Sequence, residues 1–289
     1  MLLAQVSNQD PWQWHPHPQA WLLVVGLVIA YVWAVTVLGP RRAKDGEPVA
    51  TTKQKAAFLA GTLLLLVAEE WPLHDLAEDY LFSAHMVQHM LLAFVVPPLL
   101  LLGTPSWLLR SLLGTKLRFR LIRFLTRPLI ALVLFNVAIV AMHWVVIVNL
   151  QARSQIFHVG FHSLLLGSAL LMWSVVIGPL PELNRLSAPG KMLYLFLQSI
   201  VPTVPASFLT FAGEPMYSVY EAAPRVWGLS AGTDQMIAGL IMKLGGGALL
   251  WSVITVMFFK WHAQEEAQEV DEISWEDFER ELQAWDMRK

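Results

Sequence analysis

Cysteine is absent from this 289-residue sequence, and charged residues make up only 15% of it. Without cysteine the chain can form no disulfide framework, and a soft metal ion must be held by histidine, methionine or carboxylate instead of thiolate. The low charge content excludes an ordinary soluble domain, in which about 25% of the residues are charged. Binding of nucleic acid has no support either, because this sequence contains no soluble domain with a basic stripe interleaved with aromatic residues.

The features of a cleaved signal peptide are also lacking. The first 19 residues have neither the basic start nor the continuous apolar core of such a peptide. We therefore expect the first membrane span to act as an uncleaved targeting segment.

Apolar residues are abundant, since 56% of the chain is hydrophobic and the mean hydropathy is +0.51. A helix that crosses a bilayer needs about 20 mostly apolar residues. Seven stretches approach this requirement: 21–38, 56–69, 82–102, 128–150, 156–178, 192–211 and 235–259. The sequence therefore predicts an all-α integral membrane protein, a seven-transmembrane-helix bundle in which residues 1–262 form a single transmembrane domain.

Basic residues are distributed unevenly among the loops between these spans. Seventeen of the 20 lysines and arginines lie on one alternating set of loops and on the C-terminal tail. The other set of loops holds Arg153 and Arg225, and Lys243 lies inside the seventh span. Because lysine and arginine concentrate on cytoplasmic loops, the sequence predicts an N-terminus outside and a C-terminus in the cytoplasm.

Two cytoplasmic segments have amphipathic patterns. Residues 107–127, between the third and fourth spans, mix leucine, isoleucine and phenylalanine with evenly spaced arginine and lysine. This pattern predicts a basic helix lying on the anionic lipid of the inner leaflet, with a docking surface for a partner protein as the alternative. Residues 263–289 are acidic, with apolar residues at near-helical spacing. They predict a short cytoplasmic helix packed under the bundle.

Eight of the nine histidines fall near the predicted outer surface. His85 and His89 are four residues apart on the third span, and so are His158 and His162 on the fifth, so each pair shares one helix face. With a rise of about 1.5 Å per residue, His89, His143 and His162 all lie about 10 Å deep on three consecutive spans. Ionisable residues inside a membrane are costly, and imidazole is the commonest metal ligand. These five histidines therefore predict a metal or cofactor site in the outer half of the bundle.

Methionines gather at the same depth, since Met86 and Met90 neighbour the histidines of the third span. Thioethers and imidazoles without thiolate favour copper, especially Cu(I). An acidic rim on the outer loops could attract a cation or orient the ring nitrogens. The rim consists of Glu69, Glu70, Asp75, Glu78 and Asp79.

Simpler interpretations of the same residues stay open. A membrane histidine can serve only as a hydrogen-bonding group between helices, and methionine is a common filler of apolar cores. His15 and His17, in a segment rich in tryptophan and proline, are expected at the membrane interface instead of in a metal site. His74 fits either role.

The third span carries a distinctive motif. The sequence HMVQHMLL at 85–92 is followed by PPLL at 97–100 and GTP at 103–105. This pattern resembles the polytopic CtaG family, whose members assist the assembly of bacterial caa-type cytochrome c oxidases. The resemblance covers nearly the whole chain and continues through His143, His158, His162, PMYSVY at 215–220 and DQ at 234–235.

The resemblance implies a protein of the bacterial cytoplasmic membrane that helps a heme-copper oxidase to mature and handles copper for its metal centres. Its partners are then cytochrome c oxidase subunits. Enzymatic catalysis is not expected, since no Ser/His/Asp arrangement, phosphate loop or pair of catalytic carboxylates is evident in the sequence. The copper ligands that we predict are His85, His89, His143 and His162, with His158, Met86 and Met90 as ligands through which copper arrives or leaves.

Three other functions stay open. Copper transport would need polar or thioether residues through the inner half of the bundle, where Asn136, Met172, Gln198 and Met257 form no obvious path. Heme binding would use two histidines from different helices as axial ligands. A scaffold bound to the oxidase would need the histidines only as hydrogen-bonding groups.

Overall fold

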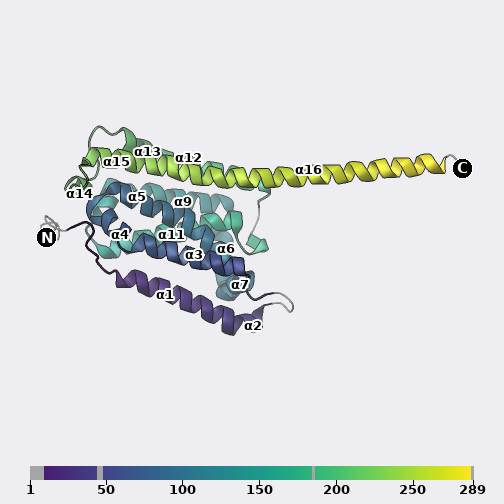
Figure 1. Ribbon diagram of the computed structural model, residues 1–289, viewed down its shortest axis with the longest axis horizontal. Helices are drawn as coiled ribbons and strands as arrows, with labels where there is room; N and C mark the ends of the chain where they lie inside the picture. Colours follow the sequence, from purple (N-terminus) through teal and green to yellow (C-terminus); the bar gives the residue numbers. More distant parts are fainter. Residues whose placement is uncertain (1–9, 44–47, 184–185, 288–289) are drawn as a thin grey trace.

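The computed structural model describes residues 10–43, 48–183 and 186–287, and this part of the chain is helical with no strand. The helices run side by side in a bundle, from which the last helix projects (Figure 1). Five helices are long and apolar enough to cross a membrane, and the number rises to seven if each of two bent helix pairs forms one span. The prediction of an all-α membrane protein is confirmed, whereas the count of seven and the orientation stay predictions.

Most of the predicted spans are built from more than one helical element. In chain order, these elements are α1 (Pro18–Trp33), a π-helical turn (Ala34–Leu38) and α2 (Gly39–Arg42); α3 (Thr52–Glu69); α5 (Phe82–Met90), a π-helical turn (Leu91–Val95) and α6 (Val96–Gly103); α9 (Pro128–Met142) and α10 (Val145–Gln151); α11 (Gln155–Ile177); α12 (Ala188–Ile200) and α13 (Thr203–Phe211); and α15 (Ala231–Leu240), a π-helical turn (Ile241–Gly245) and α16 (Gly246–Asp286). The connecting elements are α4 (Leu73–Asp75), a π-helical turn (Leu76–Tyr80), α7 (Ser106–Leu113), α8 (Lys116–Leu125), a 3-10 turn (Pro181–Leu183) and α14 (Ser218–Glu221).

An apolar core holds the bundle together. It contains Leu65 of α3, Phe135 of α9 and Leu165 of α11, which are at most 2% exposed. On the outward face of α9, by contrast, Leu129 and Val137 are 72% and 61% exposed. Apolar side chains on both faces of a helix are expected when one face packs on protein and the other on lipid.

Proline interrupts the regular hydrogen bonding of two spans. Pro97 has no N–H to donate to the Ala93 carbonyl, and the π-helical turn lies just before it. The Ala93 carbonyl instead accepts a hydrogen bond from Nε1 of Trp173 on α11, at 2.9 Å. The neighbouring helix thus satisfies a buried group that proline leaves unpaired. In the sixth predicted span, Pro202 lies at the junction of α12 and α13.

The segment between the third and fourth predicted spans forms two helices instead of the single one that the pattern predicts. α7 ends at Leu113 and is followed by Gly114, and Oγ1 of Thr115 caps α8 by accepting a hydrogen bond from the Arg118 N–H at 3.2 Å. Gly114 favours the end of one helix, because glycine weakens a helix, and Thr115 favours the start of the next, because threonine is a good N-cap. The amphipathic segment is therefore divided into two helices. No residue of α8 is buried, as a helix lying on a lipid surface requires.

The C-terminal tail does not form the predicted short helix packed under the bundle, so this prediction is wrong. α16 continues from the apolar span through Asp286 as one helix of 41 residues and projects away from the bundle (Figure 1). The sequence after Gly247 contains neither glycine nor proline. Nothing therefore ends the helix where the apolar span gives way to the acidic tail.

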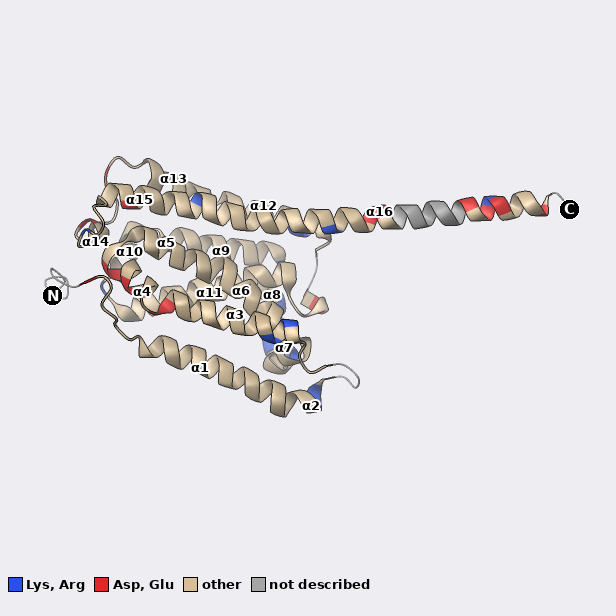
Figure 2. Cartoon of the chain, viewed as in Figure 1, with Lys and Arg blue, Asp and Glu red and all other residues tan. Residues whose placement is uncertain are grey.

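Charges are segregated between the two ends of the bundle (Figure 2). Acidic side chains gather around α4, whereas basic side chains gather around α2, α7 and α8. We call these the acidic end and the basic end. Glu69, Glu70, Asp75 and Glu78 lie in α4 or within four residues of it, and so belong to the acidic end.

Gly103 lies where α6 approaches α3 most closely, and alanine there is expected to destabilise the fold. The added Cβ would lie 2.5 Å from the backbone nitrogen of Phe58, so the two helices would have to separate. The expected loss is about 1–3 kcal/mol, measured by thermal unfolding in detergent. Gly167→Ala is the matched control, because its Cβ would meet nothing within 4 Å. Equal melting temperatures for the two variants would contradict the close approach.

Candidate metal centre

The start of α5 is fixed by a residue from a distant helix. Asp234 of α15 accepts hydrogen bonds from the backbone N–H groups of Phe82 and Ser83, at 2.8 and 3.0 Å. The first N–H groups of a helix have no partner within the helix, and here the Asp234 carboxylate, which is fully buried, supplies one. His85 and His89 follow in the next two turns, so Asp234 holds the start of the helix that carries both of them.

The loop that carries PMYSVY holds the neighbouring backbone in place. Its Met216 N–H donates to Oε1 of Gln235 at 2.6 Å. The Tyr217 hydroxyl donates to the His143 carbonyl at 2.9 Å, and the Tyr220 hydroxyl donates to the Ala77 carbonyl at 3.0 Å. These two tyrosines are buried. The motif residues of this loop therefore support the histidines without themselves being predicted ligands.

Three buried histidines meet between α5 and α11. His85, His89 and His162 each offer a ring nitrogen, and the three nitrogens lie within 4.8 Å of one another. The ring of His89 has its centroid 4.1 Å from that of His85 and 5.3 Å from that of His162. Each side chain is at most 6% exposed. We call these residues the three-histidine group.

His143 lies beside this group, in the break between α9 and α10. Its ring centroid is 6.3 Å from that of His89. Its Nδ1 donates to the Ile139 carbonyl at 2.7 Å. Its Nε2 is buried without a hydrogen-bond partner. His143 is therefore held next to the three-histidine group with one lone pair free.

Buried nitrogens without a partner are concentrated at these residues. Six ring nitrogens of the five predicted histidine ligands are buried and unpaired, namely Nδ1 of His85, both nitrogens of His89, and Nε2 of His143, His158 and His162. An unpaired buried polar atom costs about 1–3 kcal/mol. Histidines that serve only as hydrogen-bonding groups between helices are not expected to leave so many unpaired atoms, whereas ligands of a metal ion are.

Two carboxylates orient the histidines of α11. Nδ1 of His162 donates to Oε1 of Glu69 at 3.0 Å, and Nδ1 of His158 donates to Oε1 of Glu78 at 2.8 Å. In each ring the proton is thereby held on Nδ1, and the lone pair of Nε2 is free. Carboxylates orient metal-binding histidines in the same way in many proteins.

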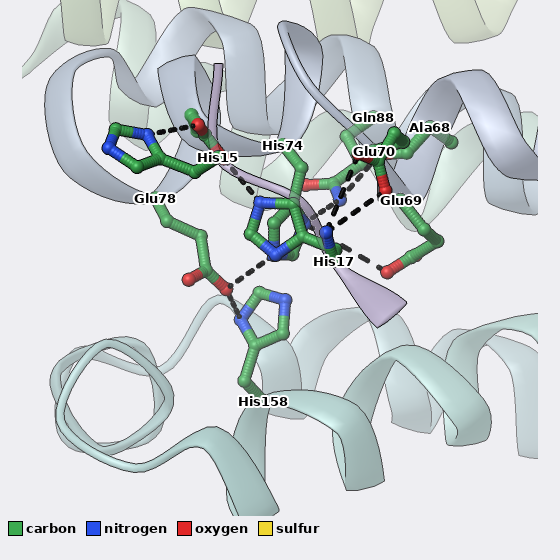
Figure 3. A network of polar contacts seen from close by, with 10 residues as sticks. His15, His17, Ala68, Glu69, Glu70, His74, Glu78, Gln88 and His158 are labelled. Carbon is green, nitrogen blue, oxygen red and sulfur yellow. Dashed lines mark hydrogen bonds and ion pairs between the residues drawn. The ribbon is translucent and has the colours of Figure 1, made fainter. Parts of the chain in front are cut away.

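A second group lies nearer the acidic end. Glu69, His74 and His158 each offer a ligand atom, and these atoms lie within 4.8 Å of one another. Oε1 of Glu78 is 2.8 Å from Nδ1 of His158 and 3.6 Å from Nε2 of His74 (Figure 3). Nε2 of Gln88 contacts Nδ1 of His74 at 3.1 Å. We call Glu69, His74 and His158 the histidine–glutamate group.

The segment before α1 covers this second group. His15 and His17, expected at the membrane interface, both contact the Asp75 carboxylate, at 2.9 and 2.5 Å (Figure 3). The His17 N–H donates to Glu70 at 3.2 Å, and the His17 ring packs edge-on against His74 with the centroids 4.4 Å apart. These contacts bind the segment to the turn between α3 and α5.

The two predicted methionine ligands are buried in the apolar core. Met86 is 1% exposed and Met90 is 8% exposed. Met90 lines a small cavity together with Met242 and Lys243. A ligand role for either methionine stays a prediction.

A small cavity lies beside two of the histidines. It is lined by Glu78, His85, Gln151, His158 and Tyr220, among others. His85 and His158 thus face the same space, with the Glu78 carboxylate beside them.

Comparisons with known proteins identify the family of this chain. The family model described as cytochrome c oxidase caa3 assembly factor matches residues 29–264. Uncharacterized proteins of Mycobacterium bovis and Mycobacterium tuberculosis are each 25% identical over 268 residues, which cover 83% of this chain. The match spans 38% of the length of each relative. No solved structure matches. The chain belongs to the family of cytochrome c oxidase caa3 assembly factors.

Proposed function

We propose that this protein binds Cu(I) in the three-histidine group and delivers it to a caa3-type oxidase during assembly. The observation that carries the proposal is the concentration of buried, unpaired ring nitrogens at the predicted ligands. Neutral imidazoles suit Cu(I), because a monovalent ion brings little charge into a buried site. The chain contains no cysteine that could compete for the ion.

The geometry supports particular roles for the histidines. His85, His89 and His162 are the direct ligands, and Nε2 of His143 is the nearest candidate for a fourth. His158 faces the acidic end and takes part in transfer, together with Met86 and Met90. Each of these ligand roles is part of the proposal.

The charge distribution supports an orientation in the bacterial cytoplasmic membrane. The basic end, with α2, α7 and α8, faces the cytoplasm, and the acidic end faces outward. Copper then reaches the site from the outer side, where the rim of carboxylates attracts cations. The basic faces of α7 and α8 rest on anionic lipid.

The polar residues nearer the basic end favour binding over passage through the membrane. Nδ2 of Asn136 donates to Oε1 of Gln198 at 2.7 Å, and Nε2 of Gln198 donates to the Tyr194 hydroxyl at 3.0 Å. These groups are engaged with one another, as expected for polar contacts between packed helices. Transport would need such groups to be free for a moving ion.

The experiment that tests this proposal measures the copper content of the purified protein. We expect roughly one Cu(I) per chain in the wild type, as a single three- or four-coordinate site requires, and little copper in His162→Ala. His262→Ala is the matched control, because His262 lies on the projecting helix and stacks on Phe258. Equal copper in His162→Ala and the wild type, or none in a folded wild type, would contradict the proposal. An intense Soret band would instead indicate heme.

A further inference from the structure

We propose that the histidine–glutamate group is a second metal site, specific for a divalent cation such as Zn²⁺ or Cu²⁺. The site consists of Glu69, His74 and His158, with the Glu78 carboxylate in contact with both histidines. It lies between the acidic surface of the bundle and the three-histidine group. It is a site in addition to the Cu(I) site proposed above.

The ligand chemistry of the two groups differs. The three-histidine group offers only neutral imidazole, whereas the second group combines imidazole with the carboxylates of Glu69 and Glu78. Imidazole and carboxylate together are the ligands of Zn²⁺ and Cu²⁺, and thioether or neutral nitrogen ligands suit Cu(I) better. The Glu69 carboxylate as a ligand, with the Glu78 carboxylate beside the two histidines, also balances the charge of a divalent ion.

The distances fit ligands around an ion better than a closed set of hydrogen bonds. Nδ1 of His74 lies 4.0 Å from Oε2 of Glu69, and Nε2 of His74 lies 3.6 Å from Oε1 of Glu78, both longer than a hydrogen bond. Glu69 is thus placed to share an ion with Nδ1, while Glu78 stands beside the other ring nitrogen. Ligands of one metal ion are separated by about 3–4 Å, since each lies about 2 Å from the ion. His74 is 6% exposed, so water solvates it little.

An unpaired nitrogen supplies an independent observation. Nε2 of His158 is buried without a hydrogen-bond partner, and the His158 side chain is 5% exposed. The His158 ring stands edge-on to the His74 ring with the centroids 5.4 Å apart. Figure 3 shows the Glu78 carboxylate facing both the His74 ring and the His158 ring. In a solvated network of surface hydrogen bonds, Nε2 of His158 would have water or a side chain as a partner instead of being buried and unpaired.

The two sites are adjacent and share a residue. Oε1 of Glu69 accepts the hydrogen bond from His162 of the three-histidine group, while Oε2 of Glu69 faces His74. The ring centroids of His158 and His162 are 4.0 Å apart. An ion in the second site therefore lies next to the ligands of the first.

The experiment measures the binding of Zn²⁺ and of Cu(I) to the same purified variants. His74 belongs only to the second site and His89 only to the first. His74→Ala is expected to weaken Zn²⁺ binding by about 100-fold or more, because even an outer-shell partner is worth about 10- to 100-fold, and to keep Cu(I). His89→Ala is expected to do the reverse. His15→Ala is the matched control, since His15 contacts Asp75 but lies outside the group.

The outcomes separate the two proposals. Zn²⁺ binding that survives in folded His74→Ala, or that disappears in His89→Ala, would overturn the second site and leave the Cu(I) site standing. A wild type that binds Zn²⁺ but no Cu(I) would support the second site and contradict the proposed function. Electron paramagnetic resonance of bound Cu²⁺ gives a further readout, with two nitrogen ligands expected and three contradicting the assignment. If His74→Ala does not fold, His74→Gln replaces it with the same expectations.

Discussion

A strain in which His85→Ala/His89→Ala replaces the wild-type protein is expected to assemble a caa3-type oxidase that is deficient in copper. The two residues provide two of the three clustered ring nitrogens. The variant keeps only His162 of that group, with His143 beside it, which is too few ligands to hold Cu(I) against other cellular ligands. The affinity for Cu(I) should therefore fall by about 100-fold or more. Oxidase activity and the copper content of the purified oxidase, measured in copper-limited cells, should fall to the level of a strain that lacks the protein.

Controls distinguish copper delivery from a purely structural role. His15→Ala/His262→Ala also removes two histidines, but both lie outside the three-histidine group, and oxidase activity should stay at the wild-type level. Excess copper in the medium should restore part of the activity in the His85→Ala/His89→Ala strain. Wild-type activity in that strain, with the variant present in the membrane, would contradict copper delivery and support the scaffold.

Much of the candidate site could be predicted from spacing alone. Histidines four residues apart must share a helix face, and the structure places His85 with His89 and His158 with His162 at ring separations of 4.1 and 4.0 Å. Depth along the spans was a coarser guide. The estimated depths group His143 with His89 and His162. In the structure, the three ring nitrogens that cluster belong to His85, His89 and His162. A rise per residue locates the backbone, but the side chains of a helix lean toward its N-terminus.

Other parts of the site could not be predicted because they depend on contacts between distant segments. The sequence predicts that an acidic rim containing Glu69 could orient ring nitrogens, but it does not show that Oε1 of Glu69 accepts its hydrogen bond from His162, 93 residues away. The contacts of His15 and His17 with Asp75 likewise join segments about 60 residues apart. Sequence composition predicts the acidic character of the rim, but only the packing of α3 against its neighbours determines which carboxylate meets which ring.

Parts of the fold could likewise be predicted from the sequence. The apolar spans follow directly from hydropathy, and the division between α7 and α8 could have been predicted from Gly114 and Thr115. The unbroken α16 could also have been predicted, because the segment lacks a helix-ending residue. The switch from apolar to acidic composition suggested a boundary, but the backbone needs glycine, proline or a cap to end a helix.

Asp234 offers the strongest test of how the fold positions the site. Its carboxylate accepts hydrogen bonds from two N–H groups at the start of α5, and it is fully buried. Alanine would leave both donors without a partner in a region that water does not reach. Each unpaired buried donor costs about 1–3 kcal/mol. The first turn of α5 would then unwind or shift, and His85 begins the next turn.

We therefore expect Asp234→Ala to lower the free energy of unfolding by about 3 kcal/mol or more and to weaken Cu(I) binding, although Asp234 is not a ligand. Thermal unfolding in detergent and Cu(I) titration measure the two effects. Ser230→Ala is the matched control, because Ser230 caps α15 at an exposed position and accepts from the Thr233 N–H at 3.1 Å. Its loss should cost about 1 kcal/mol and leave Cu(I) binding unchanged. Asp234→Asn, which keeps one acceptor oxygen, should fall between the two. If Asp234→Ala unfolds and binds Cu(I) as Ser230→Ala does, then α5 is held in register by its packing alone, and the three-histidine group does not depend on this cap.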